Sequence, residues 1–109
     1  MAATYKVLGQ SAPVATTLTA LYTVPAATST IESTVFVCNR SATPTSFRIS
    51  VAIAGAADAV AQYLYFDLAI AGNDTFAFTT GITLAATDVV RVYATLATLS
   101  FSIFGTELT

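Results

Sequence analysis

The sequence contains no histidine, and its single cysteine is Cys38. Histidine is the side chain that most often acts as a general base or binds a transition metal near neutral pH. Cys38 therefore has no partner for a Cys–His nucleophile, and without a second cysteine it forms no intrachain disulfide. We expect Cys38 to be a small buried hydrophobic residue; interchain pairing or a reactive thiol is the alternative.

Glycine is also scarce, and the five glycines are isolated from one another, so the chain has no Gly-rich phosphate-binding loop. Asp74 and Asp88 occupy predicted turns, where an Asp side chain bonds local backbone amides. A Ca²⁺ site or a glycosidase pair built from the aspartates is the alternative. We predict that the chain is not an enzyme and has no catalytic, cofactor-binding or metal-binding residues.

Charge is sparse, because only 9% of the residues are charged and the net charge is −2. The four cations, Lys6, Arg40, Arg48 and Arg91, form no basic stripe, which argues against a nucleic-acid partner. Thr, Ser, Asp or Asn interrupts every apolar run before it reaches the ~20 residues of a spanning helix, and residues 1–10 contain no signal-peptide core, so we expect no membrane partner. A surface with so few charges does little to oppose association.

Short runs of alternating apolar and polar residues, separated by turn signals, dominate the pattern. The length of 109 residues fits a single domain, 1–109, in which residues 1–13 are a candidate N-terminal arm. Segment 54–61 is predicted to be a loop or one helical turn. The predicted strands are 17–24, 31–38, 46–53, 62–70, 75–80, 88–94 and 97–104. Seven or eight short strands with one apolar face each predict an all-β fold, an antiparallel β-sandwich resembling a jelly roll.

The alternation also predicts which side chains face the core. In 17–24, Leu18, Ala20, Tyr22 and Val24 share a face. Ile31 is placed with Val35 and Val37, opposite Glu32, and Ile53 is placed with Phe47, Ile49 and Val51. In 62–70, Leu64, Phe66, Leu68 and Ile70 are predicted to face inward, opposite Tyr63, Tyr65 and Asp67. Gly105 and a polar tail are predicted to end the fold.

The outward residues supply a candidate interface. Asp67 is predicted to pair with Arg48 or Arg91 on a neighbouring strand, either within the domain or across a subunit contact. Tyrosines suit a sheet face or an interface because one end of the ring is apolar and the other is polar. Sugar stacking on Tyr63, Tyr65 and Phe66 is the alternative. The candidate interface residues are Arg48, Tyr63, Tyr65, Asp67, Arg91 and Tyr93.

Four blocks of the sequence carry a resemblance: LYTVPA (21–26), CNRSATPTSFRISVA (38–52), YLYFDLAIAGNDTF (63–76) and GITLAATDVVRVYATLATLSFSIFGTELT (81–109). In this order they resemble a group of small proteins encoded by tailed bacteriophages, many of them marine. The resemblance implies a virion component and supplies no catalytic or ligand residues. It leaves open whether the protein decorates the head or belongs to the tail.

We therefore expect a capsid decoration or cement protein that stabilises the assembled head by binding only that state. The expected partners are further copies of the chain, in a homo-oligomer of cyclic symmetry such as a trimer, and the major capsid protein. The expected location is the virion, assembled in the bacterial cytoplasm. A tail, baseplate or fibre component and a module for host glycans are the alternatives.

Overall fold

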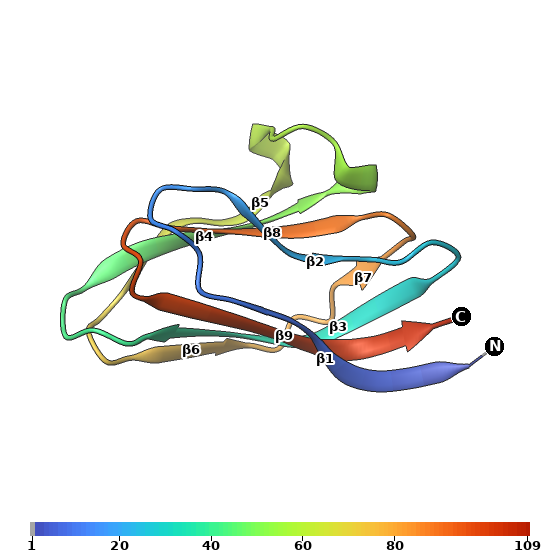
Figure 1. The fold of residues 1–109 in the computed structure, drawn as a ribbon, viewed down its shortest axis with the longest axis horizontal. Coiled ribbons are helices and arrows are strands. Elements are labelled where there is room, and N and C mark those ends of the chain that lie inside the picture. Colours follow the sequence, from blue (N-terminus) through green and yellow to red (C-terminus); the bar gives the residue numbers. More distant parts are fainter. Residues whose placement is uncertain (1) are drawn as a thin grey trace.

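Two antiparallel sheets packed face to face form the structure, a computed structural model that describes residues 2–109 (Figure 1). Sheet A contains β1 (Ala3–Ser11), β9 (Leu99–Leu108), β3 (Ser29–Asn39) and β6 (Thr75–Phe78), and the two-residue β7 (Thr83–Leu84) also pairs with β3. Sheet B contains β2 (Thr19–Thr23), β8 (Val89–Ala94), β4 (Thr45–Ala52) and β5 (Tyr63–Ile70). The predicted β-sandwich is confirmed, with nine strands in the described part of the chain instead of seven or eight.

The strand order makes the sandwich a jelly roll. Sheet A runs β1-β9-β3-β6 and sheet B runs β2-β8-β4-β5. β1 thus pairs with β9, β2 with β8, β3 with β6 and β4 with β5. Strands from the two ends of the chain therefore pair with one another, step by step toward its middle. This nested pairing of eight strands in two sheets is the jelly-roll arrangement.

Phenylalanine rings fill the centre of the core. Phe47 on β4 is 0% exposed, and the centroid of its ring lies 6.0–6.1 Å from those of Phe76, Phe78 and Phe101 on sheet A. Aliphatic side chains from both sheets surround these rings, because alternate residues of each strand point between the sheets. The aliphatic residues include Val35, Val37, Ile49, Ile70, Val90, Val92, Leu99 and Ile103.

A bulge in β3 reverses the predicted faces at the start of that strand. The register against β9 shifts between Glu32 and Thr34, so that Glu32 is fully buried and Ile31 is exposed. The prediction placed both residues on the wrong side, because one extra residue inverts the alternation beyond it. A bulge between Ala20 and Tyr22 has a similar effect in β2, where Leu21 is buried and Ala20 is exposed.

Irregular pairing with β4 also changes which side chains of β5 face the core. Its register against β4 shifts on both sides of Ile49, and Asp67 adopts a left-handed conformation with φ 53°. Leu64 and Phe66 are consequently exposed, in contrast to the prediction, while Tyr65 faces the core and stacks on Phe78 at 4.4 Å between ring centroids. Asp tolerates the left-handed region better than most residues, which allows the bulge here.

The two ends of the chain are strands, which corrects the predicted arm and the predicted polar tail. Residues 3–11 form β1, and β9 continues through Gly105 to Leu108. Beyond the strand ends, the amides and carbonyls of Ala2 and Thr109 exchange two hydrogen bonds of 2.9 Å. Figure 1 shows both termini side by side at one end of the sandwich.

Segment 53–62 folds over the outside of sheet B as two short 3-10 turns, Ile53–Gly55 and Val60–Gln62 (Figure 1). The prediction for most of this segment was a loop or one helical turn, but Ile53, predicted to face the core, belongs to it and is 77% exposed. In the range 2–109, the structure contains no helix that is long and apolar enough to cross a membrane.

A hydrogen-bonded polar cluster closes the sandwich near the termini. The Tyr22 hydroxyl donates to Glu107 Oε2 at 2.6 Å and lies 2.8 Å from Thr30 Oγ1, while Lys6 Nζ donates to Glu107 Oε1 at 3.2 Å. Burial and, after it, the neighbouring Glu107 raise the pKa of Tyr22 to about 12. The Tyr22 hydrogen bond holds the pKa of Glu107 below its usual range.

At alkaline pH, the free energy of unfolding is expected to fall less in Tyr22→Phe than in the wild type. A tyrosine whose pKa is 10.0 unfolded and about 12 folded contributes stability that is present below pH 10 and is lost as the pH rises through about 12. Urea unfolding of the wild type from pH 9 upward measures this loss, and the Phe variant should lack it while being about 1–3 kcal/mol less stable at neutral pH. Tyr93→Phe, outside the cluster, is the control; an identical alkaline loss in Tyr22→Phe would contradict the assignment.

Candidate functional site

The outer face of sheet B brings most of the predicted interface residues together. Arg48 on β4 donates through Nε to Asp67 Oδ1 at 2.7 Å and through an Nη atom to Oδ2 at 3.3 Å. The predicted ion pair between these residues is thus confirmed, with Arg48 rather than Arg91 as the partner. The left-handed conformation of Asp67 is part of the bulge that lies opposite Arg48. Hydrogen bonding to the carboxylate raises the pKa of Arg48 further.

Aromatic rings surround the Arg48 guanidinium. The guanidinium carbon, Cζ, lies 4.0 Å from the ring centroid of Phe66 and 4.3 Å from that of Tyr93, which is the geometry of a cation–π contact. Tyr63 meets Phe66 edge to face, with centroids 5.1 Å apart and planes at 87°. The Arg48 charge is therefore held by one carboxylate and two rings of the same chain.

Polar contacts fasten segment 53–62 to this face. Arg91 on β8 donates to the carbonyls of Ala56 at 2.8 Å and Gly55 at 3.2 Å. Asp88 accepts from the amide of Ala54 at 2.9 Å with one oxygen and from that of Ala85 at 2.9 Å with the other. The predicted role of Asp88, bonding backbone amides at a turn, is confirmed, and the same carboxylate also anchors the segment.

A second link holds the middle of the segment. The Tyr63 hydroxyl donates to Asp58 Oδ2 at 3.1 Å. Burial and then this hydrogen bond raise the pKa of Tyr63, so the phenol stays a neutral donor. The segment is consequently held at two places along its length, while its side chains Ile53 and Val60 are exposed.

The segment and β5 together expose large apolar side chains to solvent. Val60 is 92% exposed and Phe66 is 59% exposed, although a side chain of this kind is normally buried in a monomer. Val60, Tyr63 and Phe66 line a hollow of about 350 Å³. We call the exposed Val60 and Phe66, with the Tyr63 ring that lines the same hollow, the sheet B apolar patch.

The structure places all the predicted interface residues on this face except Tyr65, which faces the core. Sequence reasoning missed Val60, and it placed Ile53 and Phe66 on the core faces of their strands, although Phe66 also belonged to the sugar-stacking alternative. The signal for Phe66 was the following Asp67, a residue type that tolerates the left-handed conformation and can therefore end an alternation. Val60 stood alone in an Ala-rich stretch predicted to be a loop, where an isolated Val has no core to enter.

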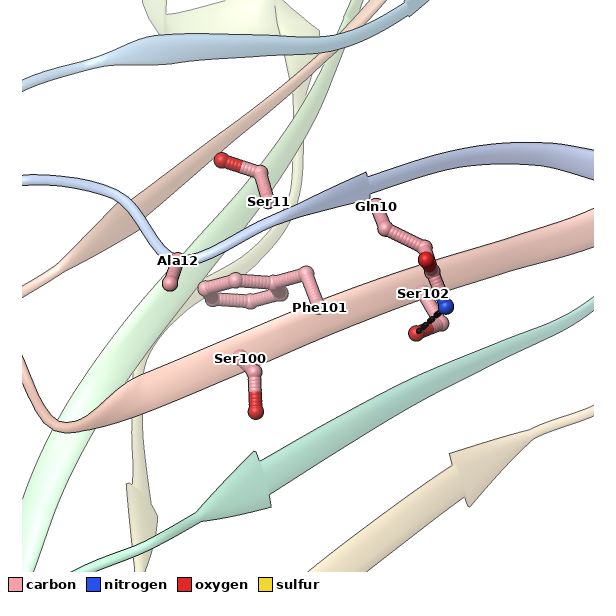
Figure 2. A pocket seen from close by; sticks show the side chains of 6 residues that line it. All are labelled: Gln10, Ser11, Ala12, Ser100, Phe101 and Ser102. Carbon is pink, nitrogen blue, oxygen red and sulfur yellow. Dashed lines mark hydrogen bonds between the residues drawn. The ribbon is translucent and has the colours of Figure 1, made fainter.

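A polar hollow of about 410 Å³ lies on sheet A between the end of β1 and β9 (Figure 2). Figure 2 shows the Gln10 amide donating to the Ser102 hydroxyl, at 3.4 Å, with Ser100 and Ser11 nearby. These hydroxyls and amides can form hydrogen bonds, but the lining has no acid or base that could activate a hydroxyl.

Two other side chains that are ionisable or nucleophilic, Glu32 and Cys38, do not line either hollow. The buried Glu32 accepts from Thr80 Oγ1 at 2.9 Å and from the Ile82 amide at 3.3 Å, and its Oε1 has no protein partner within residues 2–109. Cys38 is half-buried on β3 instead of fully buried as expected. In the described part of the chain, no group of three or more His, Cys, Asp or Glu side chains is placed to hold a metal.

Asp74, the other predicted turn aspartate, accepts a hydrogen bond from the Thr75 amide at 2.8 Å. Its predicted role is therefore confirmed as well. Comparisons of the chain with protein-family models, with curated proteins and with solved structures found no match. The resemblance to phage proteins accordingly stays a prediction.

Proposed function

We propose that this chain is a structural protein of a tailed-bacteriophage virion, a decoration protein that binds the assembled head together with copies of itself. The observation that supports this proposal is the exposure of large apolar side chains on β5 and on segment 53–62, above all Val60 at 92% and Phe66 at 59%. Exposed apolar patches of this kind mark association surfaces. The jelly roll is compatible with the proposal because it recurs in viral capsid proteins, but it also occurs in lectins and cupins.

The fastening of the sheet B apolar patch suits a role in binding. Arg91, Asp88 and Tyr63 hold segment 53–62 in place through hydrogen bonds before any partner arrives. A preorganised surface loses less conformational entropy when it docks, and more of the apolar burial then appears as affinity. A protein that binds only the assembled shell stabilises that state by mass action.

The glycan alternative fits this face less well. Sugars stack on flat aromatic surfaces, whereas Tyr63 and Phe66 stand at 87° to one another. The guanidinium of Arg48 also lies over the Phe66 ring at 4.0 Å. The rings therefore form an intramolecular cluster rather than a coplanar platform.

Purified particles of the phage that encodes this chain provide the test. We expect mass spectrometry to detect the protein in the virion, reconstruction to locate many copies on the head, and deletion of its gene to lower the temperature at which heads release DNA. A few copies at the tail would support the tail alternative instead. Absence of the chain from purified virions would refute the proposal.

A further inference from the structure

The free edge of β1 is the longest regular stretch of unpaired backbone on the sandwich in the range 2–109. β1 ends the strand order of sheet A and pairs with β9 alone, without a register shift from Ala3 to Val7. In Figure 1 it borders the molecule beside β9 at the end where the termini meet. Five residues in regular register present a row of main-chain groups about 17 Å long.

The hydrogen-bond pattern shows which groups of β1 are free. Ala2 and Thr109 exchange both of their main-chain hydrogen bonds, each 2.9 Å long. Bonded and non-bonded pairs alternate along an antiparallel ladder, so Thr4 and Lys6 direct their amides and carbonyls toward β9. The amides and carbonyls of Ala3, Tyr5 and Val7 consequently point toward the open side.

The other sheet edges are irregular or short. The edge strand β6 has four residues, and β2 has five residues with a bulge inside them. β5 is interrupted by register shifts and by the left-handed Asp67. Short strands and bulges are the usual protection of an edge against pairing with another chain. β1 is nine residues long, and its residues 3–7 contain no bulge. The Lys6 ammonium forms an ion pair with Glu107 at 3.2 Å.

The side chains at this edge favour association as well. Tyr5 is 83% exposed and Val7 is half exposed on the outer face of sheet A. Val7 lies opposite Phe104, whose ring meets that of Phe36 edge to face at 5.7 Å between centroids. An apolar stripe thus runs from the free edge onto β3, and a strand added to β1 would extend it.

We propose that β1 pairs with β1 of a second copy of this chain, in antiparallel orientation about a two-fold axis at Tyr5. The free groups of residues 3, 5 and 7 then bond those of residues 7, 5 and 3 of the other copy. Tyr5 lies opposite Tyr5, and Val7 lies opposite the small Ala3. On the other face Lys6 lies opposite Thr4, so no like charges are directly opposed. The edge is therefore complementary to itself, as a two-fold contact requires.

This inference rests on the self-association in the proposed function and not on the virion location. It replaces the expected trimer by a dimer in which two copies of sheet A become one continuous sheet. The sheet B apolar patch lies on the opposite layer and remains free for another partner. A chain that is found in virions but is monomeric in solution would overturn this inference alone.

Sedimentation equilibrium of the full chain tests the contact. We expect the mass of two chains for the wild type and an about 100-fold weaker association for Tyr5→Lys, because two ammonium groups then meet on the axis. Val60→Lys, an equal change on the sheet B apolar patch, is the matched control and should remain dimeric. An unchanged dissociation constant for Tyr5→Lys, a wild-type mass of one or three chains, or a dimer lost only in Val60→Lys would each refute the proposal.

A cysteine pair tests the register separately. In a Cys38→Ser background, Tyr5→Cys should form a disulfide between copies, because bonded antiparallel residues lie about 5.5 Å apart at Cα. Thr4→Cys, one residue away, is the control: its symmetry mate lies beyond the ~7 Å that a disulfide spans. Mass spectrometry without reductant reads the result, and equal crosslinking of the two variants would contradict the proposed register.

Discussion

Phe47→Ala is expected to lower the free energy of unfolding by about 3–5 kcal/mol. Phe47 is 0% exposed, and the rings of Phe76, Phe78 and Phe101 surround it with centroids 6.0–6.1 Å away. Removing the ring leaves a cavity between two sheets whose strands are held by their ladders and are poorly able to collapse into it. A domain of this size has about 5–15 kcal/mol of stability in total, so the variant should be close to unfolding.

Urea unfolding monitored by circular dichroism measures this difference. Phe66→Ala is the matched control, because the same atoms are removed from a ring that is 59% exposed on the outside of sheet B. The control should lose less than about 1 kcal/mol. Similar losses in the two variants would contradict the placement of Phe47 at the centre of the core.

Gly105→Ala is the second substitution for which we expect a large loss, about 3 kcal/mol. Gly105 lies in β9, paired with Lys6 on one side and Glu32 on the other. A Cβ atom here would overlap the carbonyl oxygen of Ile31 and lie 3.0 Å from the Cα of Glu32. Both contacts are with backbone, so the added methyl group can be accommodated only by moving β3 away from β9.

Gly81→Ala separates this clash from a general effect of replacing glycine. A methyl group at Gly81 would meet no atom within 4 Å, and the φ of +68° at this residue makes left-handed strain the cost. That strain amounts to about 1–2 kcal/mol. Thermal and urea unfolding of both variants should therefore rank Gly105→Ala as the less stable, and the reverse order would show that β3 and β9 are not as close as described.

Much of the fold follows from local pattern. The strand at 45–52 was predicted within a residue at each end, because Phe47 and Ile49 alternate with polar residues without interruption. Glycine, Asn and Asp at 72–74 marked a turn for reasons of backbone conformation that act over a few residues. These signals are short-range, and together they were sufficient to predict a sandwich of antiparallel strands.

The failures have a common cause. Ile31, Phe66 and Ile53 were all placed on the core side, and each lies beside a bulge or just beyond the end of a strand. A bulge depends on how a strand fits its neighbour, so alternation within one strand does not reveal it. The prediction of an N-terminal arm was wrong for a related reason. Residues 3–11 form the strand β1 only because β9, almost a full chain length away, pairs with them.

The candidate site also combines features that the sequence predicted with features that only the tertiary structure revealed. Composition and spacing indicated that Arg48 and Asp67 face outward and can pair, because that inference needs only the alternation of residues on adjacent strands. The exposed Val60, the anchoring of segment 53–62 by Arg91, and the free edge at Tyr5 depend on contacts between segments distant in sequence. Residue pattern thus decided that this chain is a sandwich poor in reactive groups, and long-range packing decided which surfaces it leaves unpaired, since exposure is a property of the assembled sheets and not of any one strand.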